Sequence, residues 1–115
     1  MFGCGGDRDK TKRPRMAKVT EEFADSIIVT SDNPRTEDPL AIINDIMAGF
    51  SKSSSGRITV EPDREKAIKL AIQNASKDDI VLLAGKGHED YQIIGKQKRH
   101  FSDKEIALKY LNELK

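Results

Sequence analysis

A chain of 115 residues is short for two ordinary domains, so its length predicts one domain with one hydrophobic core. Its 20 basic and 19 acidic side chains leave a net charge of +1, which gives no overall field to attract nucleic acid, and its apolar runs are too short to cross a bilayer. The single cysteine, Cys4, excludes an internal disulfide and is typical of a reducing compartment, so we expect a cytoplasmic protein.

The first half of the chain predicts two helices around one strand. Apolar residues recur at helical spacing over 14–24, and the β-branched run at 26–30 is typical of a strand buried on both faces of a parallel sheet. Asp38 precedes a proline as the N-cap of a helix over 39–49. The serine-rich stretch at 51–56 indicates a flexible connector.

The second half predicts a strand, a helix, another strand, a hairpin and a last helix. In chain order these are a strand at 58–60, a helix capped by Asp63, a fully buried strand at 80–84, a hairpin of 91–94 and 98–101, and a helix opened by the capping box at 102–105. Strands that alternate with helices of this length predict βαβ crossovers. The predicted fold class is therefore α/β: a Rossmann-like, mostly parallel sheet with helices on both faces and a C-terminal β-hairpin.

Three polar loops follow observed or implied strands, at 3–15, 31–35 and 85–91. Ligands of open parallel sheets collect at the carboxyl ends of the strands, so we expect the loops to form one site. Basic side chains outnumber acidic ones in the first loop, which could hold phosphate or carboxylate or could simply be solvated. Its glycines match neither the dinucleotide fingerprint nor the P-loop.

The second loop presents polar side chains on a turn stiffened by Pro34. Arg35 suits a carboxylate, because its planar guanidinium can hold two oxygens at once. Asp32 could join a ligand site, but a turn-capping role through its own backbone is the simpler interpretation.

The third loop could receive a positive charge. Gly85 and Gly87 let the backbone approach a ligand, and Glu89 can accept an ammonium group. His88 beside it suggests acid–base chemistry, although a histidine in a glycine loop is more often a hydrogen-bonded scaffold. The spacing of the histidines and Cys4 does not fit a metal site. Together the loops complement a zwitterionic amino acid.

These loops resemble three motifs of the Mur ligases, in the same order and at fitting spacings. They are Gly-Cys-Gly-Gly-Asp-Arg-Asp-Lys at 3–10, Ser-Asp-Asn-Pro-Arg at 31–35 and Gly-Lys-Gly-His-Glu-x-Tyr-Gln at 85–92. The tetrad at 32–35 resembles that of the members that add meso-diaminopimelate. The resemblance covers the whole chain but only the C-terminal, amino-acid-binding domain of the family. We therefore expect 1–115 to be that single domain, without the N-terminal domain and the central ATP-binding domain.

The resemblance implies a ligase of peptidoglycan biosynthesis, and so a role in the cell wall, cell shape and cell division. Full-length members phosphorylate UDP-N-acetylmuramoyl-L-alanyl-D-glutamate with ATP and magnesium, bound mainly outside this domain, and the amine of diaminopimelate then attacks to form an amide. This part alone is expected to be inactive and to carry no catalytic residue and no metal ligand.

The family pattern also implies roles for individual residues. By this resemblance, Arg8, Asn33 and Arg35 bind the carboxylates of diaminopimelate, and Gly85 and Glu89 receive the ammonium group at its far end. Lys10, Asp32 and His88 would make secondary contacts to the substrate or the nucleotide. L-lysine lacks the distal carboxylate and would leave Arg35 desolvated without a counter-charge, so we expect diaminopimelate to be preferred.

Two other functions compete with this reading. A stand-alone Rossmann-like module could bind a phosphorylated metabolite or nucleotide through the basic residues at 8–15. Nucleic-acid binding through the same residues is weaker, because the net charge is near neutral and the aromatic residues fall mainly at expected core positions.

Overall fold

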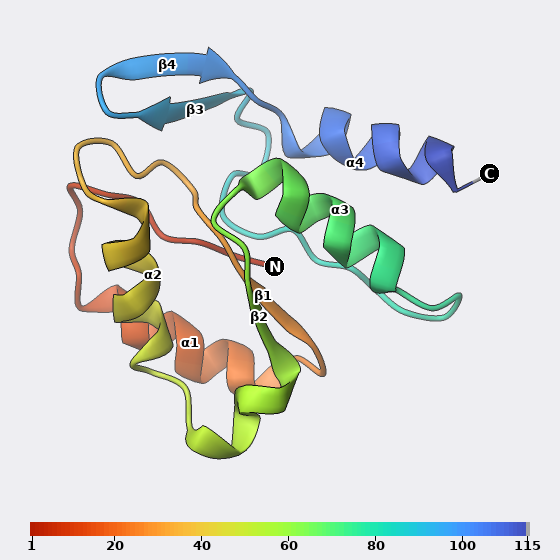
Figure 1. Cartoon of the computed structure of the whole chain (residues 1–115), viewed down its shortest axis with the longest axis horizontal. Helices are drawn as coiled ribbons and strands as arrows, with labels where there is room; N and C mark the ends of the chain where they lie inside the picture. The colour runs from red at the N-terminus through yellow and green to blue at the C-terminus, as the bar shows by residue number, and fades with distance from the viewer. Residues whose placement is uncertain (115) are drawn as a thin grey trace.

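The computed structural model describes residues 1–114. Figure 1 shows the elements in chain order. They are α1 (Lys12–Phe23), β1 (Ile27–Val29), α2 (Pro39–Met47), the 3-10 helix η1 (Lys52–Arg57), β2 (Ile58–Val60), α3 (Arg64–Asn74), β3 (Tyr91–Ile94), β4 (Gln97–His100) and α4 (Asp103–Glu113).

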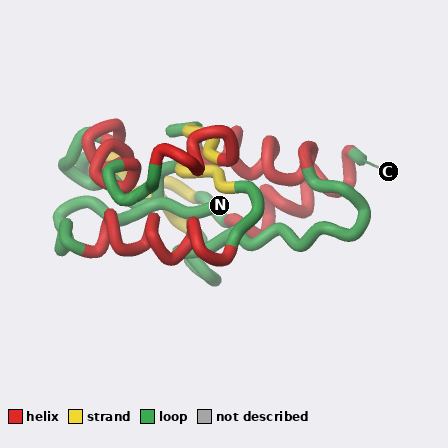
Figure 2. The backbone as a smooth tube through the Cα atoms, turned by 90° about the horizontal axis from the view of Figure 1, so that it is seen from below, coloured by secondary structure: helices red, strands yellow, loops and turns green. Residues whose placement is uncertain are grey.

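A parallel sheet lies at the centre of the fold. β1 pairs with β2 in parallel, with Ile27 opposite Ile58. On the other side of β1, Phe2 forms a parallel bridge to Val29. Helices lie on both sides of the strands, and the molecule is flat, with extents of 39 × 37 × 18 Å (Figure 2). The antiparallel hairpin of β3 and β4 follows near the end of the chain. The predicted α/β class and C-terminal hairpin are confirmed.

Two apolar clusters stabilise this arrangement. The larger joins the first residues of the chain and β1 to α1 and α2, and it is made of Phe2, Cys4, Ala17, Ile27, Val29, Ile42, Ile43 and Ile46. The smaller lies between α3 and α4 and is made of Ile68, Ile72, Phe101 and Tyr110. Both clusters leave the polar loops at the strand ends free to contact one another.

Three of the predicted helix starts are confirmed by their caps, whereas α1 begins two residues before its predicted start and has no side-chain cap. The Asp38 carboxylate accepts a hydrogen bond from the Leu40 N–H at 3.0 Å, and Asp63 caps α3 in the same way. At α4 the Ser102 hydroxyl accepts from the Glu105 N–H at 3.3 Å. The reciprocal half of the predicted capping box is wrong: within residues 1–114 the Ser102 N–H makes no hydrogen bond to the Glu105 carboxylate, which instead lies 2.7 Å from the ring of His100. The three cap side chains satisfy N–H groups that have no partner within the helix.

The predicted flexible connector at 51–56 is wrong, because most of it is helical. Residues 52–57 form η1, and the segment is fixed to α1 at its start. The Glu21 carboxylate accepts hydrogen bonds from both the backbone N–H and the hydroxyl of Ser51, each at 2.8 Å.

The predicted buried strand at 80–84 is also wrong. Within residues 1–114 this segment forms no strand, and Ile80 and Leu82 are 95% and 70% exposed. The backbone of this segment hydrogen-bonds to the rest of the sheet at a single residue, Met1. The N-terminal ammonium of Met1 donates to Leu82 O at 2.9 Å, and the Met1 carbonyl accepts from the Ala84 N–H at 3.0 Å. A parallel strand needs a neighbour along its length, and here the neighbour spans a single residue.

Candidate functional site

The three polar loops meet at one end of the parallel sheet. The Gly6 N–H donates to the Asn33 carbonyl at 2.7 Å, which joins the first loop to the second. A Cβ on Gly6 would lie 1.8 Å from Pro34 O, so only glycine allows this approach. A Cβ built on Gly85 would lie 3.6 Å from Asp32 Oδ2, so the third loop also abuts the second. The structure therefore brings the loops together as the sequence predicts.

Asn33 lies at the centre of the site and is buried. Its side-chain oxygen accepts two hydrogen bonds, from the Ile93 N–H at 2.9 Å and from Lys86 Nζ at 3.0 Å. Both neighbours are donors only, which fixes the oxygen on their side and the amide nitrogen on the other. Asn33 therefore presents N–H groups that suit a carboxylate.

Arg35 occupies a strained turn. Its φ of 52° lies in the left-handed region, which is uncommon for a side chain other than glycine, asparagine or aspartate. Its backbone bridges to β3, donating to Ile93 O at 3.1 Å and accepting from Gly95 N–H at 2.6 Å. The guanidinium Nη1 donates to Gly6 O at 2.9 Å. Within residues 1–114, Nε and Nη2 make no hydrogen bond, so they remain available to an anion.

Arg8 approaches the same place from the first loop. A Cβ built on Gly5 would lie 3.0 Å from Arg35 Nη1 and 3.6 Å from Arg8 Cγ, so the two arginines flank this glycine. Arg8 is exposed and Arg35 is half-buried. The Arg35 guanidinium and the Asn33 amide thus lie at one end of the site, and the stem of the Arg8 side chain lies beside them at Gly5.

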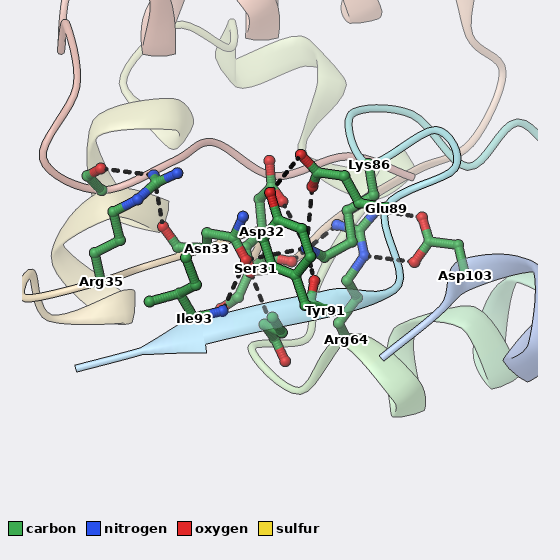
Figure 3. A network of polar contacts seen from close by, with 12 residues as sticks. Ser31, Asp32, Asn33, Arg35, Arg64, Lys86, Glu89, Tyr91, Ile93 and Asp103 are labelled. Carbon is green, nitrogen blue, oxygen red and sulfur yellow. Dashed lines mark hydrogen bonds and ion pairs between the residues drawn. The ribbon is translucent and has the colours of Figure 1, made fainter. Parts of the chain in front are cut away.

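The other end of the site carries Asp32 and Glu89, with the buried Lys86 between them. The Lys86 ammonium lies 3.3 Å from Asp32 Oδ1 and 3.6 Å from Glu89 Oε1, and it donates to Tyr91 O at 2.7 Å. The Tyr91 hydroxyl lies 3.3 Å from Glu89 Oε2. Figure 3 shows Arg35 on one side of Asn33, and Lys86 and Glu89 on the other. The Arg35 guanidinium and the two carboxylates therefore lie at opposite ends of the site.

Arg64 fixes the beginnings of two of the loops. Its fully buried guanidinium donates to Ser31 O at 2.9 Å, at the first residue of the second loop, and to Ala84 O at 3.3 Å, just before the third. The same group pairs with the Asp103 carboxylate at 2.7 Å, at the start of α4. This ion pair ties both loops to α3 and α4.

The predicted basic loop is weaker than its composition suggests. Arg13 lies inside α1 and is buried, where it donates to Glu37 at 2.8 Å, to Asp45 at 2.9 Å and to Gly5 O at 3.1 Å. The hydrogen bond from Arg13 and a second from the Asp7 N–H lower the pKa of Glu37 to about 2. Arg13 is therefore committed to the protein itself and is unavailable to an external anion.

Two secondary candidates lie at the edge of the site. Lys10 is 68% exposed and reaches Glu37 only at 3.7 Å. His88 is exposed, and within residues 1–114 its ring makes no hydrogen bond, so the expected hydrogen-bonded scaffold is wrong. Two surface hollows, of about 280 and 410 Å³, lie elsewhere, beside α1 and between α3 and α4.

Neither a metal centre nor a membrane helix is found in the part of the chain described. Over 1–114, no three His, Cys, Asp or Glu side chains gather as metal ligands would. Each helix in the same range is too short or too polar to span a membrane.

Comparison with known proteins shows the family of the chain. Residues 1–87 match the family model described as "Mur ligase, glutamate ligase domain". The chain belongs to this Mur ligase family. The predicted resemblance is thereby confirmed.

Similar full-length proteins narrow the kind of Mur ligase. A UDP-N-acetylmuramoyl-L-alanyl-D-glutamate--2,6-diaminopimelate ligase of Fusobacterium nucleatum is 64% identical over 107 residues, which are 93% of this chain and 22% of that protein. The ligase of the same name from Haemophilus ducreyi is 60% identical over 113 residues, 98% of this chain and 22% of the relative. This Mur ligase domain thus spans about a fifth of the length of these relatives.

A solved structure confirms the fold. The structure of a UDP-N-acetylmuramoyl-L-alanyl-D-glutamate--2,6-diaminopimelate ligase superimposes with a TM-score of 0.92 at 44% sequence identity. The match covers 98% of this Mur ligase domain and 23% of that chain.

Sequence reasoning missed the two buried cations of the site. Lys86 stands between two glycines and Arg64 follows a helix cap, positions at which a charged side chain is ordinarily solvated. One signal was available for Arg64: it directly precedes the apolar face of α3, whose Ala67 and Ile68 are fully buried. A residue one turn before a buried pair lies on the same face of the helix.

Proposed function

We propose that the chain is the C-terminal, amino-acid-binding domain of an ATP-dependent ligase that adds meso-diaminopimelate to UDP-N-acetylmuramoyl-L-alanyl-D-glutamate. The observation that carries the proposal is the separation of charge across Asn33, with Arg35 at one end and Glu89 at the other. Such an arrangement complements an amino acid with carboxylates and an ammonium group. The names of the similar ligases support the same substrate.

The domain would bind and orient the incoming amino acid. Arg8, Arg35 and the outward amide of Asn33 would hold its carboxylates through charge-assisted hydrogen bonds, and the Glu89 carboxylate would accept its distal ammonium group. Gly85, with a φ of 112°, lets the backbone pass beside Asp32 where a side chain would be strained. The chemical task of this domain is therefore positioning, which converts a bimolecular attack into an oriented one.

ATP and magnesium would bind mainly in other parts of the full-length ligase, as the family resemblance implies, and the UDP-linked dipeptide would bind there too. Over residues 1–114 no cluster of metal ligands is found, and the sequence carries no P-loop. The single buried thiol, Cys4, supports a reducing compartment such as the cytoplasm. The commitment of Arg13 to internal partners weighs against a stand-alone phosphate-binding module.

Arg35→Ala tests the proposal in a full-length ligase. This domain would replace the corresponding fifth of the Haemophilus ducreyi relative, and the KM for meso-diaminopimelate, ATP and the UDP-linked dipeptide would be measured. Loss of a hydrogen bond to a charged group costs about 1.5–3 kcal/mol, so the KM for diaminopimelate should rise roughly 10- to 150-fold. The other two KM values should not change.

Lys96→Met provides a matched control. Lys96 is an exposed cation in the turn between β3 and β4, on the hairpin that Arg35 contacts, and its removal should leave all three constants unchanged. If the unmodified ligase prefers L-lysine to diaminopimelate, the proposed substrate is wrong. If Arg35→Ala leaves the KM for diaminopimelate unchanged, the assignment of Arg35 is wrong.

A further inference from the structure

Lys86 is a buried cation that the proposed substrate contacts do not use. Its side chain is 0% exposed, although the glycines on both sides of it are exposed. Lysine is almost never fully buried unless its charge is compensated, because removing an ammonium group from water is costly. The position therefore requires partners close to the ammonium group.

Each of those partners belongs to the proposed ligand site. Lys86 Nζ donates to Asn33 Oδ1 at 3.0 Å and to Tyr91 O at 2.7 Å. It also lies 3.3 Å from the Asp32 carboxylate and 3.6 Å from the Glu89 carboxylate. Figure 3 shows these groups converging on one point between the second and third loops. One ammonium group thus contacts both loops at once.

The first consequence concerns the orientation of the Asn33 amide. If Lys86 were absent, Asn33 Oδ1 would keep one donor, the Ile93 N–H. With both donors in place the oxygen is fully engaged, and the amide cannot flip without opposing its own N–H groups to two other donors. Lys86 thus keeps the Asn33 amide nitrogen on the side opposite Ile93 and Lys86, where its N–H groups can donate to a carboxylate.

The second consequence concerns the net charge at the anionic end. Asp32 and Glu89 carry two negative charges, and the positive charge of Lys86 compensates one of them. The remaining charge of −1 matches a single ammonium group. The Glu89 carboxylate is also held from both sides, because Lys86 lies near Oε1 and the Tyr91 hydroxyl near Oε2, yet 35% of its side chain is exposed.

We propose that Lys86 is a positioning residue of this site: it holds the Asn33 amide and the Glu89 carboxylate in the orientation that receives the two ends of the amino acid. This inference rests on the proposed function for the identity of the ligand. The geometry of Asn33, however, can be tested without any ligand.

The first experiment uses the full 115-residue chain alone. Lys86→Met removes the charge and retains a stem of similar length, and Lys96→Met removes an exposed charge from the neighbouring hairpin. The side-chain amide signals of Asn33 would be followed by ¹⁵N NMR. They should shift and broaden in Lys86→Met and remain in place in Lys96→Met. Unchanged Asn33 signals in a folded Lys86→Met protein would overturn the proposal.

The second experiment uses the chimeric full-length ligase. Lys86→Met should raise the KM for meso-diaminopimelate about tenfold or more and leave the KM for ATP unchanged, a split that general destabilisation would not produce. An equal rise in both constants would contradict a positioning role. An unmodified chimera that does not use diaminopimelate would refute the proposed function, and the Asn33 signals would still decide the role of Lys86.

Lys86→Arg keeps the inference testable if Lys86→Met does not fold. A guanidinium retains the positive charge opposite Asp32 and Glu89, but it is larger than an ammonium group and cannot occupy the same point in a buried site. The folded Lys86→Arg variant should therefore show a KM for diaminopimelate raised several-fold and altered Asn33 signals. Wild-type values for both would overturn the proposal.

Discussion

Removing the guanidinium of Arg64 should destabilise the whole domain. Arg64 and Asp103 form a buried pair, in which the two side chains are 0% and 6% exposed and two nitrogens of Arg64 contact both carboxylate oxygens, at 2.8 and 2.7 Å. In Arg64→Met, the Asp103 carboxylate stays buried without a partner. The carbonyls of Ser31 and Ala84 also lose their donor.

The expected loss of stability is a large part of the total. Breaking one side of a buried ion pair costs about 3–5 kcal/mol, and each lost hydrogen bond to a carbonyl adds about 1 kcal/mol. Domains of this size unfold with about 5–15 kcal/mol. The sum is about 5–7 kcal/mol, and at about 4 °C per kcal/mol the Tm should fall by roughly 20–28 °C.

Urea and thermal unfolding followed by circular dichroism would measure this loss. The double variant Arg64→Met/Asp103→Leu should recover at least about 2 kcal/mol, because no carboxylate is then left unpaired. Lys109→Met, which removes an exposed ion pair with Glu65 between the same two helices, should change the Tm little. A loss below about 1 kcal/mol in Arg64→Met, or no recovery in the double variant, would refute the reasoning.

Three further predictions follow from other parts of the structure. The hydrogen bond to Glu105 raises the pKa of His100, so the contact stabilises the fold below the unfolded-state pKa of this histidine, and this stabilisation is lost as the pH rises through the folded-state pKa. Glu105→Gln should lower the titration midpoint of His100 measured by NMR. An unchanged midpoint would contradict the contact. Burial raises the pKa of the Cys4 thiol from 9.0 to about 11. At pH 8 the thiol should therefore react with iodoacetamide roughly a hundredfold more slowly in the native chain than in urea. Equal rates would show that the thiol is not buried. Four or five β-branched residues fused before Met1 should pair with β1 on one side and with residues 80–84 on the other, and should cover Ile80 and Leu82. Burying each of these two side chains contributes about 1.5–3 kcal/mol, so the Tm should rise by roughly 10 °C or more. A Gly-Ser extension of equal length is the control and should not raise the Tm.

Local signals in the sequence were sufficient for the helices. Asp38, Asp63 and Ser102 each cap the helix that they were predicted to begin, because a cap depends on atoms within one turn of the chain. The hairpin was predictable for the same reason: Gly95 adopts a φ of 61° in the two-residue turn that its position indicated.

Features that depend on distant partners were not predictable. The run at 80–84 has the composition of a buried strand, but burial requires neighbouring strands that composition does not supply. Arg13 was counted with a solvated loop, and its burial depends on carboxylates 24 and 32 residues away along the chain. Lys86 and Asn33 are separated by 53 residues, and neither sequence segment indicates their hydrogen bond.

The meeting of the three loops was predicted, but the contacts that hold them together were not. Arg35 and Glu89 were chosen by charge and by their position after expected strands, and Asn33 was chosen through the family resemblance; the structure places all three where the loops meet. Their functional roles remain predictions, which the Arg35→Ala ligase tests. Asp32, predicted to cap its own turn, instead pairs with the Lys86 ammonium across the loops.

At Arg35 the requirements of stability and of the proposed ligand binding conflict, because the left-handed backbone favours glycine while the site needs a guanidinium group. A residue with a Cβ in this conformation costs roughly 1–2 kcal/mol, a cost that glycine would relieve. Selection of this domain for heat resistance alone would therefore favour glycine here and remove the guanidinium from the site. The arginine at this position therefore carries a conformational cost that glycine would avoid, and in return it places a guanidinium in the site.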